Sequence, residues 1–72
     1  MNYQYFEIDF EHQYAICIKG VREPTIEEAR QFLAKDIERL ESDVIRVTPI
    51  HESEARNFYD FSNVDDWPVF GV

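Results

Sequence analysis

The chain has few of the residues that build cross-links, sharp turns or flexible linkers. Its 72 residues include one cysteine, Cys17, with two glycines and three prolines. A single cysteine excludes an internal disulfide, and a domain this small in an oxidising compartment commonly depends on disulfides or metals. The cysteine content therefore favours a reducing compartment, and we expect a cytoplasmic protein.

Long apolar runs and clustered bases are also missing. No apolar stretch approaches the roughly 20 residues that span a bilayer, and the start, MNYQYFEIDFEH, lacks the pattern of a signal peptide. Seven lysines and arginines stand against fifteen carboxylates, for a formal net charge of −8. Because phosphate backbones and anionic membranes require clustered cations, we expect neither direct nucleic-acid binding nor membrane binding. The charge fits a basic protein partner, or solubility alone.

Hydrophobic residues are nevertheless abundant. They form 44% of the chain, and eleven residues are aromatic, which indicates a folded protein. The length corresponds to one small domain, residues 1–72. A domain of this size buries only about 60% of the surface that its unfolded chain exposes. Its stability is therefore marginal, and each large apolar side chain contributes a considerable fraction of it.

Alternation of apolar and polar residues predicts an antiparallel hairpin from residues 3–10 and 14–19. One face carries the larger apolar side chains, namely Phe6, Ile8, Phe10, Tyr14, Ile16 and Ile18. The opposite face mixes Tyr5, Ala15 and Cys17 with Glu7, Asp9 and Lys19. A half-apolar face of this kind requires a cover or a partner.

The clearest local signal lies in PTIEEARQFLAKDIERLE. Thr25 and Glu28 form a T-x-x-E capping box, which marks a helix start. Apolar residues then recur at spacings of three and four, at Ile26, Ala29, Phe32, Leu33, Ile37 and Leu40. The pattern predicts one helix from about 26 to 41.

The remaining segments complete an α+β fold of order β-β-α-β. DVIRVTPI predicts a third strand, which Pro49 ends or places at a sheet edge. Residues 51–60 fit a short helix or an extended segment, and Pro68 excludes a regular helix in the irregular tail from Ser62 onward. We expect a three-stranded antiparallel sheet with one long helix on one face and a short irregular or helical C-terminal segment.

The C-terminal segment, residues 51–72, is acidic and aromatic. Its last fifteen residues include five aromatics and three carboxylates. The aromatics are Phe58, Tyr59, Phe61, Trp67 and Phe70. Most of these rings are expected to complete the core, either on the half-apolar sheet face or at the end of the helix–sheet sandwich. Trp67 is the ring that a partner would reach most readily, because Asp65, Asp66 and Pro68 surround it.

No residue pattern indicates catalysis or ligation. Cys17 lies in mid-strand between isoleucines, as a packed thiol does, although His12 and His51 are conceivable neighbours in space. The chain lacks paired zinc ligands, a calcium loop, a catalytic triad order and a phosphate-binding loop. We therefore predict no catalytic, cofactor or metal site, and an enzyme is disfavoured.

The preferred hypothesis is a small acidic binding protein that regulates or neutralises a basic protein partner. In a more specific version of this hypothesis, the carboxylates imitate nucleic-acid phosphates. The expected partner-binding residues are Glu7, Asp9, Asp60, Asp65, Asp66 and Trp67. One alternative is a homodimeric structural protein that uses its open sheet face as the interface. Another is a small-molecule binder or small oligomeric enzyme around Cys17.

Overall fold

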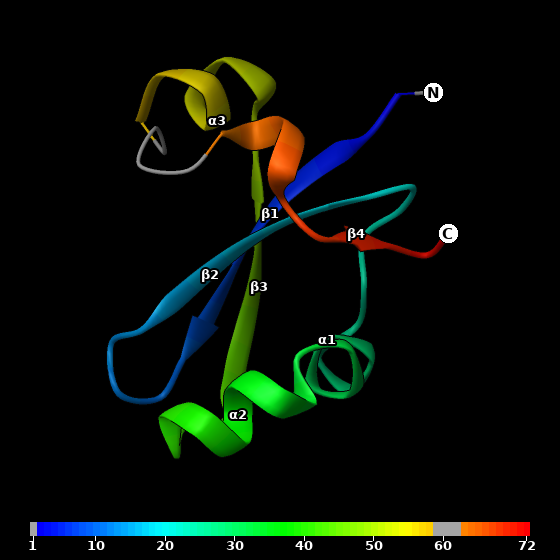
Figure 1. Cartoon of the computed structure of the whole chain (residues 1–72). Helices are drawn as coiled ribbons and strands as arrows, with labels where there is room; N and C mark the ends of the chain where they lie inside the picture. Colours follow the sequence, from blue (N-terminus) through cyan, green and yellow to red (C-terminus); the bar gives the residue numbers. More distant parts are fainter. Residues whose placement is uncertain (1, 59–62) are drawn as a thin grey trace.

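A computed structural model describes residues 2–58 and 63–72. A four-stranded sheet of order β3-β1-β2-β4 lies between two groups of helices (Figure 1). The elements are β1 (Gln4–Phe10), β2 (Ala15–Gly20), α1 (Ile26–Phe32), α2 (Ala34–Leu40), β3 (Val44–Ile50), α3 (Glu52–Phe58), the 3-10 helix η1 (Val64–Asp66) and β4 (Val69–Phe70). The predicted mixed α+β class is confirmed, whereas the three-stranded sheet and the single long helix are wrong in detail.

The predicted hairpin and third strand are present. β1 pairs antiparallel with β2 on one side and with β3 on the other. The Phe10 N–H donates to the Tyr14 carbonyl at 2.8 Å and closes the hairpin loop. Within that loop Gln13 has φ 64°, in the left-handed region where hairpins commonly place glycine or asparagine.

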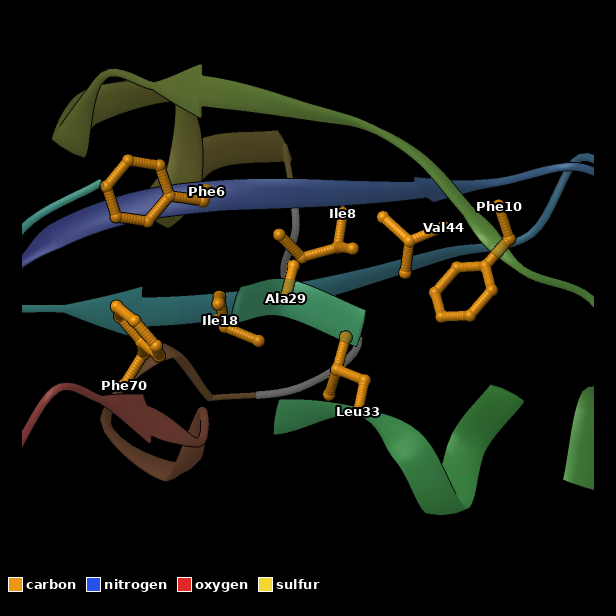
Figure 2. Close-up of a cluster of buried hydrophobic side chains, with 8 residues drawn as sticks. All are labelled: Phe6, Ile8, Phe10, Ile18, Ala29, Leu33, Val44 and Phe70. Atoms are coloured by element: carbon orange, nitrogen blue, oxygen red, sulfur yellow. The ribbon is translucent and has the colours of Figure 1, made fainter. Parts of the chain in front are cut away.

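One face of the sheet carries the main core. Strand alternation directs the apolar side chains of β1 and β2 toward α1, as Figure 2 shows. The buried residues of this core are Phe6, Ile8, Phe10, Ile18, Ala29, Leu33, Val44 and Phe70. The predicted capping box is confirmed as well, because the Glu28 N–H donates to Thr25 Oγ1 and the Thr25 N–H donates to a Glu28 carboxylate oxygen.

The helical segment breaks at Leu33, which corrects the predicted single helix. Leu33 has φ −108° and ψ 28°, outside the helical region, and α1 and α2 run in different directions (Figure 1). Neither proline nor glycine marks the break, whereas the Leu33 side chain is only 4% exposed in the core. We attribute the break to packing on the sheet. Two members of the predicted apolar stripe, Ile26 and Phe32, are 41% and 36% exposed.

A fourth strand corrects the predicted irregular tail. β4 runs parallel to β2, with Lys19 opposite Val69 and Gly20 opposite Phe70. Gly20 permits this pairing, because a Cβ atom there would stand 3.0 Å from the Phe70 carbonyl oxygen. Residues 51–60, left open between helix and extended chain, contain α3 up to Phe58. Residues 59–62 lie outside the described part of the chain.

The backbone conformation at the end of α2 can be tested by substitution. Glu41 caps this helix in the left-handed region, with φ 52° and ψ 41°, where a side chain costs energy that glycine avoids. We predict that Glu41→Gly raises the free energy of unfolding by about 1 kcal/mol in urea denaturation. Glu38→Gly, inside α2, should instead lower it by about 1 kcal/mol. Destabilisation by both changes would contradict the left-handed cap.

Candidate functional site

The C-terminal segment forms a second core on the other face of the sheet. Trp67 is 4% exposed and meets Tyr5 edge to face, with ring centroids 5.9 Å apart. Ile50, Ala55 and Val64 complete this buried cluster, and Cys17 packs against it. The expectation that a partner reaches Trp67 most readily is therefore not met, because the indole is enclosed by its own chain. Phe70 lies in the main core. The Phe58 side chain, Tyr59 and Phe61 lie outside the described part of the structure.

Lys19 joins this segment to the sheet. The side chain is buried although it carries a charge, and it lies beside Tyr5 in the strand register. Its Nζ donates to the carbonyls of Val64 at 3.2 Å and Asp65 at 2.8 Å. It also lies 5.3 Å from the centroid of the Tyr3 ring, a favourable cation–π arrangement. Sequence reasoning placed Lys19 on the half-apolar face but gave it no partner, because both acceptors are backbone atoms about forty-five positions along the chain.

A surface hollow of about 370 Å³ opens next to Lys19. It is lined by Asn2, Tyr3, Tyr5, Lys19, Glu52, Arg56 and Asp65. The charges of two cations, Lys19 and Arg56, balance those of two carboxylates, Glu52 and Asp65. Arg56 Nε donates to the Glu52 carboxylate, and Lys19 Nζ donates to a backbone carbonyl. The hollow therefore favours no single class of ligand.

Cys17 is a packed thiol with little nucleophilic character. Burial, followed by the neighbouring charges of Glu7 and Asp9, raises its pKa to about 11, and the reactive form of cysteine is the thiolate. His12 lies in the hairpin loop, and His51 follows the opposite end of β3, so the two imidazoles flank the sheet at different ends. Residues 2–58 and 63–72 contain no cluster of three or more His, Cys, Asp or Glu that would hold a metal ion.

Glu7 and Asp9 share the sheet face that Trp67 covers in part. The Asp9 carboxylate accepts from Arg46 Nε at 2.9 Å and from Thr48 Oγ1 at 3.0 Å. Burial alone would raise the pKa of Asp9, but hydrogen bonds with Arg46, Glu7 and Thr48 lower it below its ordinary value overall. Asp9 is thus a structural ion-pair partner as well as a candidate for recognition.

Asp65 and Asp66 belong to a different element. Both are exposed in η1, where the Asp65 N–H donates to Asn63 Oδ1 at 3.0 Å. The structure therefore pairs Glu7 with Asp9 on β1, and Asp65 with Asp66 on η1, without joining the two pairs in one row. Asp60 lies outside the described residues.

The arginines show how the chain uses its few cations. Each of the five forms an ion pair with a carboxylate of the same chain. The pairs are Arg22–Glu28, Arg30–Glu27, Arg30–Asp43, Arg39–Asp36, Arg46–Asp9 and Arg56–Glu52. At Glu28 the hydrogen bond with Arg22 is the main reason why the carboxyl pKa falls to about 2. With the arginines engaged internally, the acidic excess dominates the surface.

Comparisons with protein family models, curated proteins and solved structures found no match for this chain. Within the described ranges, none of the helices has the length and apolar character required to cross a membrane. The functional argument therefore depends on the chemistry of the surface.

The buried lysine generates a prediction about stability. Lys19→Met keeps most of the apolar stem but removes the hydrogen bonds that Nζ donates to the carbonyls of Val64 and Asp65. The Val64 carbonyl keeps the Trp67 N–H as a donor. Because hydrogen bonds from a charged donor are stronger than average, we expect a loss of about 2 kcal/mol in the free energy of unfolding, measured in urea. Lys35→Met on the exposed surface of α2 is the control and should change it by less than about 0.5 kcal/mol. Equal effects of the two changes would show that Lys19 does not hold the C-terminal segment.

Proposed function

We propose that this chain is a small acidic cytoplasmic protein that binds a basic protein partner and regulates or neutralises it. The observation that carries the proposal is the engagement of all five arginines in ion pairs within the chain. Arginine is the side chain best suited to bind carboxylates and phosphates of another molecule. With its arginines engaged, the surface is suited to attract cations.

The carboxylates outside these ion pairs also favour a positively charged partner. Seven of them are exposed and have no ion-pair partner within the described residues. These seven are Glu11, Glu23, Glu38, Glu41, Glu54, Asp65 and Asp66. A surface of one sign accelerates the encounter with a partner of the opposite sign and selects against partners of the same sign.

The distribution of these seven carboxylates supports general attraction more directly than phosphate imitation. They are spread over the hairpin loop, the loop before α1, the end of α2, α3 and η1. Imitation of a nucleic-acid strand would require carboxylates in a row on one surface, at phosphate-like spacing. We therefore propose charge-assisted binding of a basic protein without specifying a nucleic-acid-binding partner.

Affinity capture from the lysate of the native host, with elution along a salt gradient, tests the proposal. A captured protein is then purified and titrated against this chain at about 50 mM and about 300 mM salt. We expect a basic protein whose Kd increases by at least about tenfold between these conditions, because salt screens exposed charges.

The matched variant is Glu23→Gln/Glu38→Gln/Glu54→Gln, which removes three carboxylates that have no ion-pair partner in the described structure. It should slow association while thermal unfolding stays the same. An interaction that is insensitive to salt and to this variant, or capture of nothing except a second copy of the chain, would contradict the proposal.

A further inference from the structure

We infer that the basic partner docks at the hairpin end of the sheet, with an arginine side chain entering a hollow between Tyr14 and Ile45. This inference rests on the proposed function and specifies the surface that performs it. The hollow has a volume of about 250 Å³ and joins the ends of β1, β2 and β3. Cofactors and small ligands commonly occupy about 300–1,000 Å³, so a single side chain of a protein fits this space better.

The C-terminal segment leaves this part of the sheet open. Its buried cluster covers the end of the sheet where Tyr5 lies opposite Ile50. Asp9, opposite Ala15 and Arg46, lies four residues further along β1, toward the hairpin loop. The hollow is at this second end, where Ala15 and Arg46 are exposed.

Two exposed apolar side chains form walls of the hollow. Tyr14 is 47% exposed and Ile45 is 48% exposed. Among the large apolar residues of the described surface, only Val72 is more exposed. Buried Phe10 also lines the hollow. Exposed apolar groups gathered around one depression are typical of a contact surface.

The backbone explains why Ile45 is on the surface. The register of β1 and β3 passes from Asp9 opposite Arg46 to Phe10 opposite Val44, so Ile45 is the additional residue of a β-bulge. A bulge interrupts the alternation of a strand and redirects a side chain, and bulges are frequent next to functional sites. Val44 enters the core while Ile45 and Arg46 both line the hollow.

The charges around the hollow identify its occupant. Two carboxylates, Asp9 and Glu11, line it together with one guanidinium, Arg46. Arg46 is paired with Asp9, whereas Glu11 has no ion-pair partner in the part of the chain that the structure describes. An incoming arginine would place its apolar stem against Ile45 and its planar guanidinium over the Tyr14 ring. The guanidinium would also donate hydrogen bonds to the Glu11 carboxylate. An acidic occupant would be repelled by Asp9 and Glu11, and a purely apolar one would offer Glu11 no donor.

The test uses a defined probe, a peptide of alternating arginine and leucine, titrated into ¹⁵N-labelled protein at low salt and followed by NMR. The matching peptide of alternating glutamate and leucine is the negative control. We expect the largest amide shifts at residues 10–15 and 44–46, and smaller shifts elsewhere.

Charge-matched and size-matched variants locate the site. Glu11→Gln should raise Kd for the arginine peptide about fivefold, whereas Glu38→Gln, with the same change in net charge, should raise it less than about twofold. Ile45→Thr should weaken binding in the same way, and Ile26→Thr, at an isoleucine of similar exposure on α1, should not. Amide spectra away from the substitution verify that each variant is folded.

The outcomes separate this inference from the proposed function. If Glu11→Gln and Glu38→Gln weaken binding equally, and the shifts spread over α2 and α3, the hairpin site is wrong while attraction to a basic partner stands. If the arginine peptide does not bind at low salt, or binds no better than the glutamate peptide, the inference and the proposed function both fail.

Discussion

The packing of Trp67 on the second face of the sheet is the contact on which the rest of the structure depends. A sheet with helices on one side only would expose Tyr5 and Ile50, and a domain of this size cannot lose that apolar area. The C-terminal segment instead returns across the sheet and buries both residues with Trp67. Lys19 adds hydrogen bonds to the carbonyls of η1. The result is one sheet with a core on each face, one packed against α1 and the other against the C-terminal segment.

This arrangement determines which surfaces remain for recognition. Since Trp67 is enclosed, the C-terminal segment contributes to the outside mainly through charged residues such as Asp65 and Asp66. Two exposed apolar side chains, Tyr14 and Ile45, instead line one hollow at the hairpin end, beside the bulge. There an apolar surface and an acidic surface meet, whereas elsewhere the charges are spread. A basic partner would gain long-range attraction from the whole molecule and local contacts at this end.

The sequence predicted the elements that local patterns encode. Alternation identified the strands and placed Glu7 and Asp9 on one face, and Thr25 with Glu28 marked the helix start. The break at Leu33 has no local signal, because packing on the sheet produces it. β4 has only two residues, too few for a period, and its pairing depends on the missing side chain of Gly20. The hollow beside Ile45 was also missed, because the bulge arises from the pairing of two strands far apart in sequence.

The most direct test compares two probes of the same urea denaturation. Trp67 is the only tryptophan of the chain, so its fluorescence reports on the second core, while far-UV circular dichroism reports on the helices and the sheet. If the C-terminal segment is part of one cooperative structure, the two transitions coincide and the folded protein shows the blue-shifted emission of a buried indole. A fluorescence transition at clearly lower urea, with the circular dichroism unchanged, would show a separable tail and contradict this account.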